Sequence, residues 1–227
     1  MNRRGRIYGV LLILIIFSLS DRLFADEDNT PRLRKLDLTP FQKSLDQFSE
    51  TRAAEIEEQL RDATILDLQA ALQTGKLTSE ELTLFFLDRI QRYDEKLRSY
   101  IELNPNALSE ARAADALRAK GIIHSQLHGI PINLKDNIDT KSPLHTTGGA
   151  EILLHHSPEQ DAELVTSLRS AGAVILGKAS LSEFAGALTM DPTGANAVSG
   201  AGVNPYHPGL EVSGSSSGSA ISTTAYL

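Results

Sequence analysis

A strand, a helix and a second strand follow one another in the middle of the chain, and this order restricts the fold more than any other feature. Residues 129–134 have the pattern of a strand that ends at a polar turn. Residues 161–171 have a helical period, and residues 173–176 form a short apolar run typical of a strand buried on both faces. The helix residues expected to face inward are Leu164, Val165 and Leu168. Because such a unit places its strands parallel, we predict an α/β fold with a mixed, largely parallel sheet flanked by helices.

Three helices are predicted before this unit. Thr64 followed by Asp67, and Thr78 followed by Glu81, match the capping box that marks a helix start. A third helix is predicted over residues 107–120, after an Asn-Pro pair. One face of the second helix carries large apolar and aromatic side chains that we expect in the core: Leu82, Phe85, Phe86, Ile90 and Tyr93.

Two segments carry residues suited to chemistry. Lys135 follows an apolar strand, where burial disfavours the charged form of a lysine and leaves a base. Residues 213–220 are serines, glycines and an alanine, which allow the backbone to approach a substrate closely. Serine with a neutral lysine is a recurring means of activating a hydroxyl for acyl transfer. A flexible linker is the alternative interpretation of the Ser/Gly run, but the turn-forming segment 204–209 before it favours a fixed turn.

Three other patterns are assigned structural roles. Residues 172–179 nearly match the phosphate-binding pattern G-x-x-x-x-G-K-[ST], but Ala179 replaces the required hydroxyl and the intervening residues form an apolar strand. A zinc-binding helix shows two histidines at i, i+4 together with a glutamate. None of the 6 histidines belongs to such a set, so we predict no metal site. Glu183 is a candidate acid or base, but at a helix start it is more simply a partner for the helix dipole.

The N-terminus has the pattern of an export signal. Three arginines precede an apolar run over residues 7–17, and a small residue then precedes an acidic stretch. We predict residues 1–25 as a signal peptide, with an uncleaved membrane anchor through residues 7–20 as the alternative. Residues 26–55 are polar and weakly patterned, and we predict a tether there. The body of the protein is therefore expected to be exported, to the periplasm or the medium.

The chain after the predicted signal is acidic. It holds 18 basic and 28 acidic side chains, a net charge of −10. Because phosphate binding needs a basic surface, this charge argues against a nucleic-acid partner. The chain contains no cysteine, so an oxidising compartment is tolerated without disulfides.

Four segments, in one order, resemble the amidase signature family. Residues 129–140 contain that family's G-I-P-x-x-x-K-D-N, and residues 213–220 are similar to its G-G-S-S-x-G-S, with Ser213 in place of the first glycine. Residues 177–184 and 204–206 also look like family segments. The resemblance covers about residues 60–227 and implies the amidase signature fold and the hydrolysis of linear carboxamides.

The resemblance also implies a Ser-cisSer-Lys triad. Lys135 would be the general base, Ser215 the bridging serine after a cis peptide bond, and Ser216 a substrate-binding residue, with no cofactor or metal. The family's nucleophile lies about two dozen residues beyond the bridging serine, which places it after Leu227. We therefore predict residues 56–227 to be the N-terminal part of an amidase domain, incomplete at its C-terminus.

Three functional hypotheses follow. The first is an exported amidohydrolase of a small-molecule or peptide amide, most similar to the peptide amidases, with this fragment inactive without the nucleophile. The predicted export disfavours the cytosolic tRNA-dependent amidotransferase, which shares the motifs. The second is a non-catalytic binding protein, and the third is a truncated gene product. Unpaired strand edges in an incomplete sheet also predict poor soluble expression.

Overall fold

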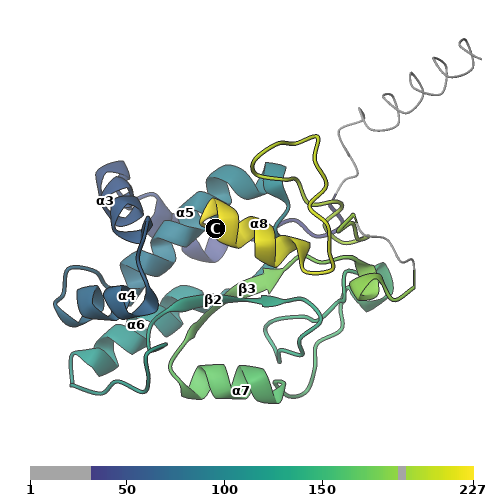
Figure 1. Cartoon of the computed structure of the whole chain (residues 1–227). Helices are drawn as coiled ribbons and strands as arrows, with labels where there is room; N and C mark the ends of the chain where they lie inside the picture. The colour runs from purple at the N-terminus through teal and green to yellow at the C-terminus, as the bar shows by residue number, and fades with distance from the viewer. Residues whose placement is uncertain (1–31, 189–192) are drawn as a thin grey trace, which may run out of the picture.

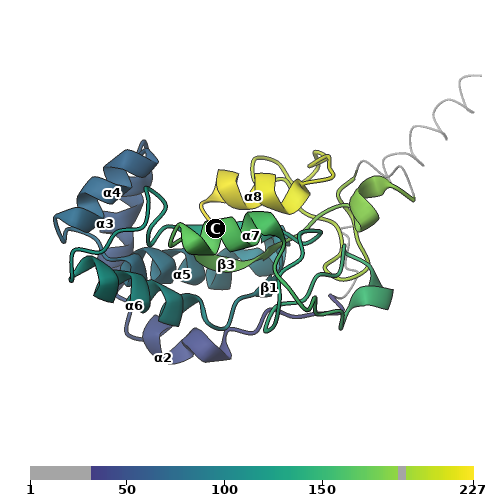
Figure 2. The same cartoon turned by 90° about the horizontal axis from the view of Figure 1, so that it is seen from below.

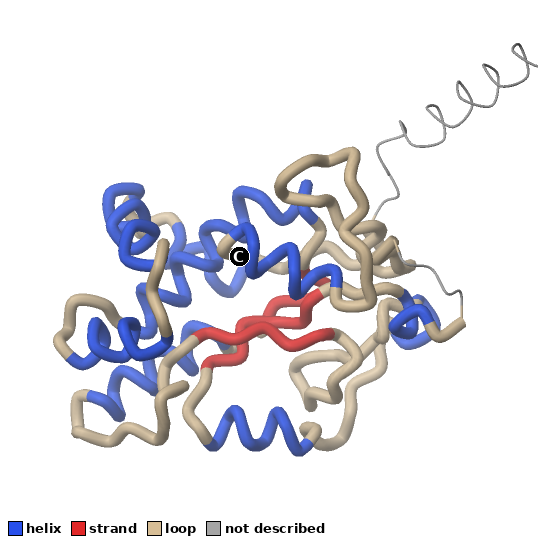
Figure 3. Tube along the Cα trace, in the orientation of Figure 1, coloured by secondary structure: helices blue, strands red, loops and turns tan. Residues whose placement is uncertain are grey.

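The computed structural model of the chain describes residues 32–188 and 193–227. The strands of the sheet lie in the middle of the molecule in Figure 1, between α7 (Glu163–Ser170) and α8 (Ser217–Ala225). Figure 3 shows the same strands in red, with helices above and below them and loops at the right-hand end. The other elements, in chain order, are η1 (Thr39–Phe41), α2 (Gln42–Leu45), α3 (Glu50–Leu60), α4 (Ile65–Gln73), α5 (Ser79–Leu97), β1 (Tyr100–Leu103), α6 (Ala107–Arg118), β2 (Pro131–Lys135), η2 (Glu151–Leu153), β3 (Val174–Ala179) and η3 (Glu183–Gly186).

The sheet of the described residues is mixed, with strand order β1-β3-β2. β2 pairs with β3 in parallel, with Ile132 opposite Ile175 and Lys135 opposite Ala179, and α7 connects the two strands. The predicted strand–helix–strand unit and the α/β class are therefore confirmed. β1 pairs antiparallel with β3 and was not predicted, because its four residues follow directly on the longest helix and carry no clear alternation.

Helices cover both faces of β3, which explains its continuous apolar run. Val174 and Leu176 pack in a cluster with α5 and α6, whereas Ile175 packs against Val165 of α7. All six residues of the strand are buried, as predicted for its first part. The prediction that Leu164 faces inward is wrong: it is 53% exposed, because the short α7 turns only its Val165 and Leu168 side toward the sheet.

The predicted helix starts are confirmed at α4 and α5. Thr64 and Thr78 each accept a hydrogen bond from the third residue of the helix, whose carboxylate bonds back to the cap backbone. Of the apolar face predicted for α5, Leu82, Phe85 and Ile90 are buried and Phe86 is partly buried against the core. Tyr93 is 43% exposed and was wrongly predicted in the core; its ring lies at the margin of the stripe, 5.1 Å from the Arg89 guanidinium carbon.

Residues 26–55, predicted as a polar tether, pack against the domain from residue 32 onward. The Arg32 side chain is 3% exposed and its Nη2 lies 3.0 Å from Asp94 Oδ2 in α5. Phe41 and Leu45 are buried in the cluster formed with α5 and α6, and Figure 2 shows α2 against these helices. Phe41, Leu45 and Phe48 follow one another at a helical spacing, so the sequence did carry a short apolar stripe here, and the prediction of a tether overlooked it.

The predicted signal peptide or anchor, residues 1–25, lies outside the described residues. Among the helices of residues 32–188 and 193–227, none combines the length and apolar character needed to cross a membrane.

Candidate active site

Lys135 is the last residue of β2, and its side chain is half-buried. Its Nζ lies 2.6 Å from Ser215 Oγ, in a hydrogen bond between residues that are 80 positions apart in the sequence. Burial lowers the pKa of Lys135, since it disfavours the ammonium form. The structure therefore brings together the two residues assigned as base and bridging serine, in a geometry that allows proton exchange.

Ser215 stands on the turn that leads into α8. The peptide bond between Gly214 and Ser215 is cis. The Ser215 carbonyl accepts a hydrogen bond of 3.0 Å from the backbone N–H of Ser182, in the segment that follows β3. Both members of the Lys135–Ser215 pair are thus fixed to the sheet, one through β2 and one through the extension of β3.

Ser216 is exposed at the start of α8, directly after the bridging serine. Its carbonyl accepts the N–H of Ala220 in the first helical turn, and its side chain faces solvent. An exposed hydroxyl next to Ser215 is placed where a substrate could reach it. Its role in substrate binding stays a prediction.

Glu183 has a structural partner. One of its carboxylate oxygens accepts the backbone N–H of Ala197 at 2.9 Å, and its own N–H donates to Ala195. The carboxylate therefore anchors the long loop before the Ser/Gly run. Sequence analysis missed Asn196 in this loop, whose buried amide donates to Leu181 O and Ser180 Oγ at 2.9 Å. The sequence signal at Asn196 was only its position in a glycine-rich segment, which predicts a loop but not a buried amide.

Across residues 32–188 and 193–227, no three histidine, aspartate or glutamate side chains come together as metal ligands. His128 is buried, with Nε2 3.0 Å from the Ala114 carbonyl, which agrees with a structural role. Lys178, which produced the near-match to a phosphate-binding loop, is fully buried in β3 and cannot meet a phosphate in solution.

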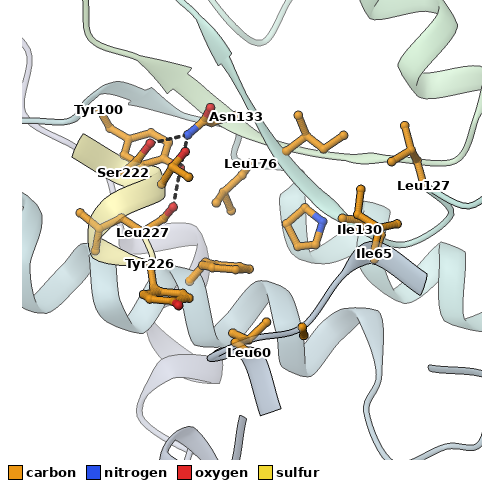
Figure 4. Close-up of a pocket in the computed structure, with 15 residues that line it drawn as sticks. Leu60, Ile65, Tyr100, Leu127, Ile130, Asn133, Leu176, Ser222, Tyr226 and Leu227 are labelled. Carbon is orange, nitrogen blue, oxygen red and sulfur yellow. Dashed lines mark hydrogen bonds between the residues drawn. The ribbon is translucent and has the colours of Figure 1, made fainter. Parts of the chain in front are cut away.

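A pocket of about 390 Å³ lies between β2, α8 and the helices before the sheet, and Figure 4 shows its lining. It is mainly apolar, with one polar end where Asn133 Nδ2 lies 2.7 Å from Ser222 Oγ and 3.3 Å from the Tyr100 hydroxyl. None of its lining side chains is acidic or basic, and neither Lys135 nor Ser215 lines it. The pocket is therefore separate from the Lys135–Ser215 pair, although both involve β2.

Ser213 has a left-handed backbone, with a φ of 56°, at the position where the resembling family has glycine. Replacement with glycine is expected to keep or raise the stability by up to about 1 kcal/mol, because glycine adopts this φ without a steric penalty. Ser213→Val is expected to destabilise by about 1–2 kcal/mol, since a branched side chain is strained there. Thermal unfolding followed by circular dichroism tests both. A valine variant as stable as the glycine variant would contradict the expectation.

Comparison with known proteins places these residues in context. A family model for amidases matches residues 81–227. A probable amidase of Arabidopsis thaliana is 44% identical over 173 residues, which cover 74% of this chain and 33% of that protein. A glutamyl-tRNA(Gln) amidotransferase component of Myxococcus xanthus is 38% identical over 168 residues, covering 74% of this chain and 34% of its own length.

Among solved structures, the native peptide amidase from Stenotrophomonas maltophilia is similar, with a TM-score of 0.68 and 44% identity. The match covers 71% of this chain and 34% of that enzyme. The chain thus spans about a third of the length of the relatives that it matches.

Proposed function

The chain belongs to the amidase family, and on that premise we propose that it provides the general base and the bridging serine of an amidohydrolase that cleaves linear carboxamides. The observation that carries this proposal is the 2.6 Å contact between Lys135 Nζ and Ser215 Oγ. Because burial lowers the pKa of Lys135, its amine is more readily neutral than that of an exposed lysine. A neutral amine bonded to a hydroxyl is equipped to take a proton from a second hydroxyl.

The proton moves in a relay of two steps. Lys135 accepts the proton of Ser215 while Ser215 takes the proton of the nucleophilic hydroxyl, whose oxygen bonds to the amide carbon. As the carbon–nitrogen bond breaks, the proton returns through Ser215 to the leaving nitrogen, and ammonia and an acyl-enzyme ester result. Water then attacks the ester through the same relay, which releases the carboxylic acid and restores the hydroxyl.

The nucleophilic hydroxyl is proposed to come from outside these 227 residues. This follows the family's motif order, in which the nucleophile comes after the bridging serine, and it accords with a chain that spans about a third of its relatives. The 227-residue chain is accordingly proposed to be inactive on its own. A non-catalytic binding remnant and a truncated gene product are the alternatives.

The substrate is proposed to be a peptide amide or a similar small linear amide. The similarity to a peptide amidase, at 44% identity, supports this class. The apolar run with its arginine-rich start supports export to the periplasm or the medium, with membrane attachment through residues 7–20 as the alternative. Export disfavours the amidotransferase activity named for the Myxococcus relative, because charged tRNA is found inside the cell.

Release of ammonia from a C-terminal peptide amide tests the proposal. The 227-residue chain is expected to release none, whereas the product of the complete gene, read past Leu227, is expected to release it. In that product Ser215→Ala should lower kcat/KM by about 10²–10⁴-fold, with Ser219→Ala in the helix that follows as the matched control. Ammonia release by the 227-residue chain that disappears in Ser215→Ala would overturn the external nucleophile. A complete product that hydrolyses no amide would favour the binding alternative.

A further inference from the structure

The buried lysine of β3 has an unusual set of partners. Lys178 is fully buried, and its Nζ lies 2.7 Å from Ile138 O, 3.0 Å from His145 O and 2.9 Å from Thr146 Oγ1. A fourth oxygen, Thr140 Oγ1, lies at 3.3 Å. All four oxygens belong to the loop that follows Lys135, so the buried amine of Lys178 connects several parts of that loop through hydrogen bonds.

The partners of Lys178 require its protonated form. The two carbonyls can only accept hydrogen bonds, and both threonine hydroxyls lie within reach of Ile138 O, Thr140 at 3.0 Å and Thr146 at 3.2 Å. Their hydrogens are thus directed at that carbonyl, and they offer Lys178 their lone pairs. Burial lowers the pKa of Lys178 and the Asp136 carboxylate opposes that effect. Because all four neighbouring oxygens accept hydrogen bonds, Lys178 is assigned the protonated form, which has three N–H donors and no lone pair.

Asp136 supplies the opposite charge and is the residue next to Lys135. Its Oδ1 lies 3.5 Å from Lys178 Nζ, and both side chains are fully buried. Its Oδ2 accepts hydrogen bonds from the backbone N–H and the hydroxyl of Thr147. Its own N–H donates to Ala179 O, and its carbonyl accepts from Gly148, each at 3.0 Å. The backbone and the side chain of Asp136 are thus both fixed.

This arrangement controls the direction of the neighbouring side chain. Successive side chains at the end of a strand point to opposite sides, so an inward Asp136 turns Lys135 outward, toward Ser215. A buried ion pair is a weak source of stability, because desolvation offsets much of the attraction. The contacts between Asp136 and Lys178 are therefore expected to affect the orientation of the Lys135 side chain more than the stability of the fold.

We propose that Asp136 and Lys178 are positioning residues that hold Lys135 against Ser215. The proposal rests on the proposed function, in which Lys135 is the base. It also gives a role to the lysine of the G-x-x-x-x-G-K-A segment, which the sequence left without one.

The test measures the pKa of Lys135 in the folded chain, by NMR of lysine labelled with ¹³C at Cε, with the signal assigned through Lys135→Arg. In the wild type this pKa should lie below the ordinary lysine value. In the double variant Asp136→Asn/Lys178→Met, which removes both charges together, it should rise by about one unit, since a released loop exposes the amine. Thr147→Val removes one hydrogen bond to Asp136 and should shift it in the same direction with less risk to folding. Lys141→Met, an exposed lysine on the same loop, is the matched control.

The outcomes separate the two ideas. A lower melting temperature with an unchanged Lys135 pKa in both variants would make the pair merely structural and overturn the proposal. An ordinary lysine pKa in the wild type would instead remove the base from the proposed function. A shift in the double variant and in Thr147→Val, but not in Lys141→Met, supports the positioning role.

Discussion

Replacing Gly218 with alanine is expected to destabilise the chain by about 3 kcal/mol or more. A Cβ on Gly218 would lie 2.6 Å from Ser180 O and closer still to Ser180 N and Ser99 O. These neighbours are backbone atoms of the sheet region, which cannot rotate away as a side chain could. Urea or thermal unfolding measures the effect. Gly209→Ala is the matched control, because its Cβ would meet only the exposed side chain of His207, at 3.2 Å.

The same substitution should disturb the site. The Gly218 N–H donates to Ser180 O at 3.0 Å, and two residues further on Ser182 holds the carbonyl of Ser215. Moving the first turn of α8 away from this segment therefore moves Ser215 away from Lys135. A Gly218→Ala variant with wild-type stability would show that α8 can shift to make room for the added methyl group. The close backbone contact would then not account for a glycine at this position.

Local patterns predicted the elements whose cause is local. The capping boxes at Thr64 and Thr78, and the apolar run of β3, are set by residues within a few positions of one another, and all three are present in the structure. The contact between Lys135 and Ser215 joins residues 80 positions apart. No periodicity predicts such a contact. Side-chain chemistry paired Lys135 with the serine run, and only the family resemblance identified Ser215 within it.

What the sequence did not predict depends on long-range packing. β1 forms where Tyr100–Leu103 meets the edge of β3, and the segment around Phe41 is ordered by α5 and α6. The ion pair of Asp136 and Lys178 is the clearest case. Each residue is unremarkable in its own segment, and only the parallel pairing of β2 with β3 brings the two charges together.

Replacing Lys135 with methionine is expected to lower amide hydrolysis by the complete gene product by about 10³–10⁴-fold, because the amine proposed to accept the proton of Ser215 is lost. Methionine is of similar length and uncharged, so the fold should be kept. Ammonia release at saturating and limiting substrate gives kcat and kcat/KM. Both should fall, since the interaction that is lost acts in the transition state. Lys141→Met should retain full activity, and a Lys135→Met enzyme within tenfold of the wild type would exclude this lysine as the base.

The difference in stability between Lys135→Met and the wild type should depend on pH. Burial holds the pKa of Lys135 in the folded chain below its unfolded value. Between those two values the unfolded chain binds more protons, so the stability of the wild type rises with pH across that interval. The free-energy cost of burying the charged Lys135 amine is complete below the pKa of the folded chain and absent above the pKa of the unfolded chain. Methionine carries no such penalty, so the variant should gain relative to the wild type as the pH falls through the interval, as urea unfolding at several pH values measures. An equal difference at every pH would mean that Lys135 titrates alike in both states, which is incompatible with a base prepared by burial.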